Sequence, residues 1–334
     1  MRYKFIDFVA GFCAYFIYDS TTAMAQSLDA LKTPPVTLSS LTPSELNTFG
    51  IKAINEAYTI FSQVGSKTGE IGGRLNQENL NAVKNAKALF DDRALIQTAR
   101  LNFGITKKSF VPTDIDDFEA SDVIVTIPSN GIIVASYKMT LPNRVDLKTK
   151  SVLSGEVAPR LTVLRWDDRR KQWLVFSHAD FDTPSATLCG TPSGFKQRKS
   201  IFLKDNIDLA KSILDAQFQN AVDGNSAKGQ AKGFQVVYAS GEQRDSRKPP
   251  SYTFSKKPQI TEVEATRKGD LLAIRYNGPG AASFDGNTVD PSVKPRLLTF
   301  YKNENGEWLR ISAAIFSVTS KVANDVKCIM PTVK

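Results

Sequence analysis

A histidine and a carboxylate two positions apart, His178 and Asp180, are the side chains of this 334-residue sequence best placed for acid–base chemistry. Both lie in the segment WLVFSHADF, residues 173–181, and His178 is the only histidine of the chain. Histidine titrates near neutral pH and burial raises the proton affinity of a carboxylate, so such a pair can act as general acid and base. The alternative is a structural role, with His178 hydrogen-bonded within the fold and Asp180 at the solvent-exposed end of a strand.

A second segment, WLRISAAIF at residues 308–316, matches the first without its histidine. Alternate residues of a strand point to opposite faces, which places Phe176, His178 and Asp180 together on one face. The corresponding face of the second segment is apolar throughout and comprises Leu309, Ile311, Ala313 and Ile315. We therefore expect His178 and Asp180 to point into a core or pocket, where polar groups are costly unless they are paired or hydrated.

Three aromatic residues are candidates for contacting a ligand. Tyr137 and Tyr276 end the matching segments GIIVASY and DLLAIRY, and their hydroxyls can donate to a ligand oxygen, with amphipathic core positions as the alternative. Phe176 is the third, on the predicted face of the histidine. Arg160 and Arg296 also correspond, each after a proline at the start of a strand, which favours a scaffold role such as an ion pair.

Each half of the chain is predicted to begin with helices and to continue as strands. The pattern predicts a capping box at Thr42 and Glu45 with Pro43 at the first helical position, and Asp205 is a predicted cap for the helix of the second half. A further helix is expected at about residues 77–90. Predicted strands span residues 123–127, 132–139, 161–166, 173–181, 234–238, 260–265, 271–276, 296–301 and 308–316. Three matching blocks in the same order indicate a duplicated unit.

The helix, the bent sheet and the closing strand pair PRLTVLRWDDRRKQWLVFSHADF resemble the NTF2-like superfamily, in particular its SnoaL-like and ketosteroid-isomerase-like group. The resemblance implies an α+β fold of two tandem cone-shaped domains, residues 42–189 and 201–330, each with N-terminal helices packed on a curved antiparallel sheet. It also implies an apolar pocket and a pairing of the two halves as an intramolecular pseudo-dimer. Such cones serve isomerases, cyclases, dehydratases, ligand binders and interaction domains, so the fold alone assigns no function.

The first 25 residues have the features of a signal peptide: basic Arg2 and Lys4, an apolar run at residues 8–18 and the small residues AMA at 23–25. We therefore expect a periplasmic or secreted protein, with an uncleaved anchor as the alternative. Residues 26–41 and 190–200 lack periodicity and are predicted linkers. Removal of the predicted signal peptide would leave two cysteines, Cys189 and Cys328. A disulfide between them and two free thiols are both open alternatives.

Composition narrows the functions further. The formal net charge of +9 suits an anionic envelope surface. The 43 lysines and arginines of the chain are scattered along the sequence, which argues against nucleic-acid binding. One histidine and no CxxC pair give zinc no ligand set, and no nucleotide motif is present, so neither a metal nor a cofactor is expected. The sequence predicts an exported protein that binds a small apolar or amphipathic molecule. Its alternatives are a cofactor-free isomerase, cyclase or dehydratase that uses His178 and Asp180, and an envelope protein-interaction or assembly module.

Overall fold

The computed structural model describes residues 30–68, 77–98, 104–107, 119–140, 144–145, 152–153, 157–181, 202–239, 241–254, 257, 259–278, 283–284, 287–288 and 295–316. The predicted signal peptide, the predicted linker at 190–200, Cys189 and Cys328 lie outside these residues. Within them, none of the helices combines the length and the apolar composition that a membrane span requires.

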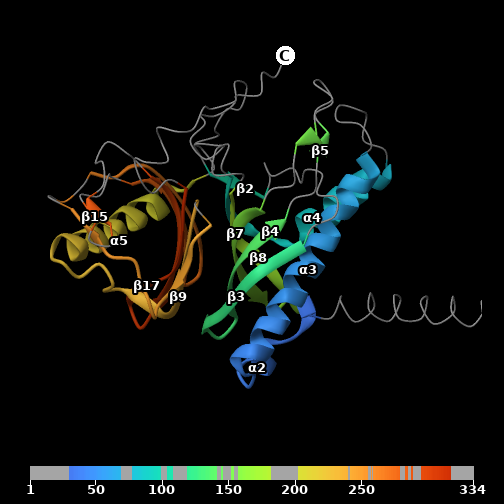
Figure 1. Ribbon diagram of the computed structural model, residues 1–334, viewed down its shortest axis with the longest axis horizontal. Helices are drawn as coiled ribbons and strands as arrows, with labels where there is room; N and C mark the ends of the chain where they lie inside the picture. Colours follow the sequence, from blue (N-terminus) through green and yellow to red (C-terminus); the bar gives the residue numbers. More distant parts are fainter. Residues whose placement is uncertain are drawn as a thin grey trace, which may run out of the picture.

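Two six-stranded sheets with helices on their outer faces make up the described structure (Figure 1). The helices are η1 (Ala30–Lys32), α2 (Pro35–Leu38), α3 (Pro43–Thr68), α4 (Gln77–Ala88) and α5 (Lys204–Val222). The first sheet has the order β2-β1-β8-β7-β4-β3 and contains β1 (Phe90–Thr98), β2 (Ile105–Thr106), β3 (Glu119–Ser129), β4 (Ile132–Thr140), β7 (Val157–Asp167) and β8 (Gln172–Asp180). The second has the order β10-β9-β17-β16-β13-β12 and contains β9 (Gln230–Tyr238), β10 (Gln243–Asp245), β12 (Thr261–Lys268), β13 (Leu271–Asn277), β16 (Arg296–Glu304) and β17 (Glu307–Ile315). Short strands β5 (Arg144–Val145) and β6 (Val152–Leu153) pair with each other, and β11 (Tyr252–Thr253), β14 (Ser283–Phe284) and β15 (Asn287–Thr288) form a small third sheet.

The two large sheets share one strand order, as a duplicated unit requires, but they are mixed rather than antiparallel. The strand that follows the helices in each unit runs parallel to the last strand, in the pairs β1–β8 and β9–β17. The prediction of purely antiparallel sheets is therefore wrong, although the α+β class fits. Strand β1 begins at Phe90, where the sequence predicts only the end of a helix. Because this strand was not predicted, its parallel pairing with β8 was not predicted either.

The predicted capping box at the start of α3 is confirmed. The backbone N–H of Thr42 donates to Glu45 Oε2 at 2.8 Å, and the N–H of Glu45 donates to Thr42 Oγ1 at 3.3 Å. These two bonds satisfy amides that a helix start leaves without partners. The helix continues through Gly65, where the sequence predicts its end, to Thr68.

Residues 30–41, which the sequence assigns to a linker, instead pack against the first unit. Ala30, Leu31 and Leu38 are buried in its core. The fully buried carboxylate of Glu56 on α3 accepts the backbone N–H groups of Ala30 and Leu31, each at 2.8 Å. Because these contacts come from a residue 25 positions away, local periodicity gives no sign of them.

The two sheets face each other, with α3 and α5 on the outer faces (Figure 1). An apolar cluster lies between the sheets, and buried polar contacts such as that of Gln235 with the carbonyl oxygen of Val134 lie beside it. In this cluster the rings of Phe176 and Phe300 meet edge to face with centroids 5.3 Å apart, and those of Phe181 and Phe316 stack at 4.3 Å. Each sheet therefore has one face covered by a helix and the other by its counterpart.

Candidate functional site

A β-bulge at Phe176 decides which side chains of β8 share a face. Val163 pairs with Ser177 and Leu164 pairs with Val175, which leaves Phe176 without a partner in the ladder. The extra residue shifts the alternation by one position, so Phe176 points to the layer between the sheets. The prediction that Phe176 shares a face with His178 is therefore wrong, because a bulge interrupts the period of two on which it rests.

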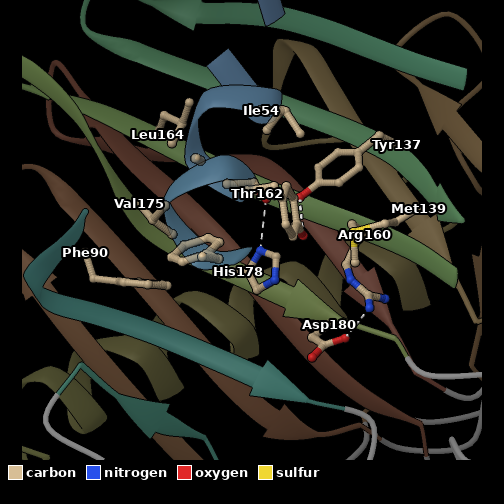
Figure 2. Close-up of a pocket in the computed structure, with 13 residues that line it drawn as sticks. Ile54, Phe90, Tyr137, Met139, Arg160, Thr162, Leu164, Val175, His178 and Asp180 are labelled. Atoms are coloured by element: carbon tan, nitrogen blue, oxygen red, sulfur yellow. Dashed lines mark hydrogen bonds and ion pairs between the residues drawn. The ribbon is translucent and has the colours of Figure 1, made fainter. Parts of the chain in front are cut away.

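His178 lines a cavity of about 60 Å³ that lies between α3 and the first sheet (Figure 2). Much of the wall is apolar and includes Ile54, Phe61 and Phe90. The polar part comprises Tyr58, Tyr137, Arg160, Thr162, His178 and Asp180. Sites for drug-sized ligands usually measure about 300–1,000 Å³, so this cavity suits a small molecule or one end of a longer one.

Four side chains form a continuous chain of hydrogen bonds along the cavity wall. The hydroxyls of Tyr58 and Tyr137 lie 3.0 Å apart, Tyr137 lies 3.0 Å from Thr162 Oγ1, and Thr162 Oγ1 lies 2.9 Å from His178 Nδ1. Burial raises the pKa of both tyrosines above the usual value, that of Tyr137 well above it. Both hydroxyls therefore keep their protons at neutral pH and can pass a hydrogen bond along the chain.

An ion pair closes the polar side of the cavity. Arg160 Nη2 lies 2.8 Å from Asp180 Oδ1, with 5% of the arginine side chain and 33% of the aspartate side chain exposed. Arg160 Nη1 also donates to the carbonyl oxygens of Phe181 and Pro159. The predicted ion pair at Arg160 is thus present. Asp180 is bound to this guanidinium, and no hydrogen bond joins it to His178 among the described residues.

The electrostatic surroundings make His178 an uncharged ring. Burial and, after it, the positive charge of Arg160 lower the pKa of His178 from its usual 6.5 to about 3. A base with so low a pKa holds a proton weakly at neutral pH, so the predicted role as a general base is unfavourable. The neutral ring can still donate or accept one hydrogen bond at the cavity surface.

The register of the two sheets shows which residues of the second unit correspond to this site. Tyr137 on β4 pairs with Arg160 on β7, and Tyr276 on β13 pairs with Leu297 on β16. The structural counterpart of Arg160 is therefore Leu297. The predicted match to Arg296 is wrong by one residue, because the shared Pro-Arg dipeptide lies at different positions of the two ladders.

The same register fixes the counterparts of the acid–base pair. Arg160 lies opposite Asp180, and Leu297 lies opposite Ile315. Thr162 lies opposite His178, whereas the corresponding Thr299 lies opposite Ala313. The second unit keeps the tyrosine and the threonine and replaces the arginine, histidine and aspartate with apolar residues.

Tyr276 lies away from the cavity, in the core of the second unit beneath α5. Its ring meets that of Phe218 edge to face with centroids 6.2 Å apart. Its hydroxyl is buried, with no hydrogen-bond partner in the part of the chain that the structure describes. The structure therefore brings His178, Asp180 and Tyr137 to one cavity, and places Tyr276 and Phe176 elsewhere.

Tyr58, Thr162 and Arg160 are members of the site that sequence reasoning did not assign to it. Tyr58 looks like one more apolar position of α3, and Thr162 is one of many strand threonines. The substitution of Arg160 by a leucine in the second copy is a signal that a correct register would have shown. The described residues include no group of three or more potential metal ligands.

No protein-family model matches the chain, and no curated protein matches it. Among solved structures it is similar to an NTF2-like protein from Cytophaga hutchinsonii, at 16% identity and a TM-score of 0.27, over 35% of this chain and 99% of the other. An NTF2-like protein from Pseudomonas putida aligns at 12% identity and a TM-score of 0.24, over 34% and 87%. An NTF2-like protein involved in plasmid conjugation aligns at 10% identity and a TM-score of 0.22, over 60% and 76%. The predicted likeness to NTF2-like proteins is thus found among solved structures, as a similarity of fold over part of the chain, and it assigns no function.

Proposed function

We propose that the first unit binds a small amphipathic molecule in the cavity between α3 and its sheet. One observation supports this above all: the cavity has a polar wall in the first unit where the second unit has Leu297, Ala313 and Ile315. Buried polar groups cost free energy, and the second unit forms the same sheet with apolar residues at these three positions, while a buried cation of its own, Arg310, lies elsewhere on β17. We attribute their retention in the first unit to a ligand.

The second unit, in this proposal, supports the first as its partner in an intramolecular pseudo-dimer. The aromatic layer formed by Phe176, Phe300, Phe181 and Phe316 covers the face of the first sheet that α3 leaves open. Residues 1–25 further support export, so the ligand would be one of the periplasm or the cell exterior.

A cofactor-free isomerase, cyclase or dehydratase is the second candidate function. It is favoured by the presence of both His178 and Asp180 at a single cavity. In this candidate the carboxylate of Asp180 would accept the proton, and His178 would bind the substrate as an uncharged ring. Binding without turnover would leave the first candidate in place.

Native mass spectrometry of the full chain, purified from its own envelope fraction, tests the proposal. We expect the wild type to retain a small molecule and the triple variant Arg160→Leu/His178→Ala/Asp180→Ile, which copies the second unit, to lose it. Tyr276→Phe is the matched control because it alters the second unit, and it should keep the ligand. A wild type free of small molecules, or a triple variant that retains the same mass, would contradict the proposal.

A further inference from the structure

We propose that His178 donates a hydrogen bond from Nε2–H into the cavity, and that the site selects ligands with an uncharged oxygen acceptor such as the carbonyl of a ketone, lactone or amide. This inference rests on the proposed function, since it names the chemical class of the ligand. It follows from the direction of the hydrogen-bond chain.

Arg160 sets that direction. Burial raises the pKa of Tyr58, and the nearby positive charge of Arg160 offsets part of that rise; both residues line the same cavity. A hydroxyl near a cation turns its oxygen towards the charge and its hydrogen away from it, and successive hydrogen bonds polarise one another. The favoured chain therefore runs away from the cation, from Tyr58 to Tyr137 and Thr162 and then to Nδ1 of His178.

The end of the chain determines the tautomer of the imidazole. A neutral imidazole has one N–H and one acceptor nitrogen, so a ring that accepts at Nδ1 has its proton on Nε2. Thr162 occupies Nδ1, and His178 is partly accessible at the cavity (Figure 2). No hydrogen bond joins Nε2 to any residue that the structure describes. This N–H is therefore the group of the ring that a ligand can engage.

The charges around the cavity favour a neutral acceptor over a charged one. The positive charge of Arg160 is balanced by Asp180 at 2.8 Å, so the polar wall has no net charge to offer. A ligand carboxylate would be desolvated against apolar walls and would compete with Asp180. An ammonium group would be desolvated in the same way and would face an N–H donor rather than an acceptor at His178. A carbonyl oxygen accepts the hydrogen bond from Nε2–H and brings no charge. In this arrangement Arg160 is a positioning residue that acts through three hydroxyls.

The tautomer can be measured directly, because the chain has a single histidine. In the full protein labelled with ¹⁵N-histidine, the two imidazole nitrogens report which one holds the proton. We expect a protonated Nε2 and an unprotonated Nδ1 at neutral pH. Thr162→Val removes the partner of Nδ1 and should produce a mixture of tautomers, whereas Thr299→Val, its counterpart in the second unit, should leave both signals unchanged. A ring protonated at Nδ1 in the wild type would overturn the inference.

The ligand class is tested on the same sample with cyclopentanone, cyclopentanecarboxylate and cyclopentylamine as probes. We expect cyclopentanone to shift the Nε2 signal to saturation, with an affinity about five- to tenfold lower in Thr162→Val, as the loss of one neutral hydrogen bond implies. Equal binding of all three probes would overturn the acceptor selectivity and leave the proposed binding site standing. No shift with any probe would overturn the ligand class, and the native mass spectrum would decide the binding site independently.

Discussion

Arg160 and Leu297 occupy the same position in two copies of one sheet, each opposite the tyrosine of the neighbouring strand. Arg160 forms an ion pair with Asp180, whereas Leu297 lies beside Ile315. The chain thus contains an internal comparison for these positions of the candidate site, with apolar residues in place of the ion pair. Residues of the first unit can therefore be replaced by their counterparts from the second. Such substitutions distinguish the side chains that folding needs from those that only a ligand would need.

Loss of one partner of the ion pair should cost more than replacement of both partners. Asp180→Asn leaves Arg160 buried without its anion and should lower the free energy of unfolding by about 2 kcal/mol, less than for a fully buried pair because Asp180 is one-third exposed. Arg160→Leu/Asp180→Ile, which copies the second unit, should be more stable than Asp180→Asn. Urea denaturation measures both variants, and a double variant no more stable than Asp180→Asn would contradict the account.

Two equivalent tyrosines should respond differently to loss of the hydroxyl. Tyr137→Phe interrupts the chain between Tyr58 and Thr162 and should destabilise the protein by about 1–3 kcal/mol. Tyr276→Phe removes a buried hydroxyl for which the described residues offer no partner, so it should be neutral or stabilising. Thermal and urea unfolding give both values. Equal losses in the two variants would show that the hydrogen-bond chain contributes little.

Stability should depend on pH through His178. Its pKa is about 3 in the folded protein and near 6.5 when unfolded, so the unfolded chain binds more protons between these values. The contribution of the neutral ring is complete above pH about 6.5 and is lost as the pH falls towards 3, by up to about 1.4 kcal/mol per pH unit. Unfolding measured from pH about 7 to 4 should therefore show a steeper decline for the wild type than for His178→Gln. Parallel curves would mean that the ring is not held neutral by the fold.

The docking of residues 30 and 31 should depend on Glu56. Glu56→Ala leaves two buried N–H groups without their acceptor and should cost about 2–4 kcal/mol. Glu45→Ala, at the exposed capping box, should cost only about 0.5–2 kcal/mol. Hydrogen exchange adds a local readout, because the amides of Ala30 and Leu31 should lose protection only in Glu56→Ala. Unchanged protection there would contradict the anchoring role.

Local chemistry made much of the fold predictable. Thr42 and Glu45 predict the start of α3 correctly, because a capping box is formed within one helical turn. The strands around residues 132–139 and 173–181 were visible from their apolar runs and turn residues, and the comparison of two copies correctly directed attention to His178 and Asp180.

The remaining features depend on contacts that no short window contains. The bulge at Phe176 lies where β8 pairs with both β7 and β1, and it places this ring on the face opposite to the one predicted. The ladder register places Leu297, rather than Arg296, opposite Tyr276. The carboxylate of Glu56 orders a segment that has no periodicity of its own.

Binding of cyclopentanone, followed by saturation-transfer NMR, tests the central claim that the polar wall of the first cavity forms a ligand site. We predict transfer from the wild type and from Tyr276→Phe, and its loss in Arg160→Leu/His178→Ala/Asp180→Ile, provided that this variant unfolds cooperatively. Equal transfer from the wild type and the folded triple variant would contradict the claim.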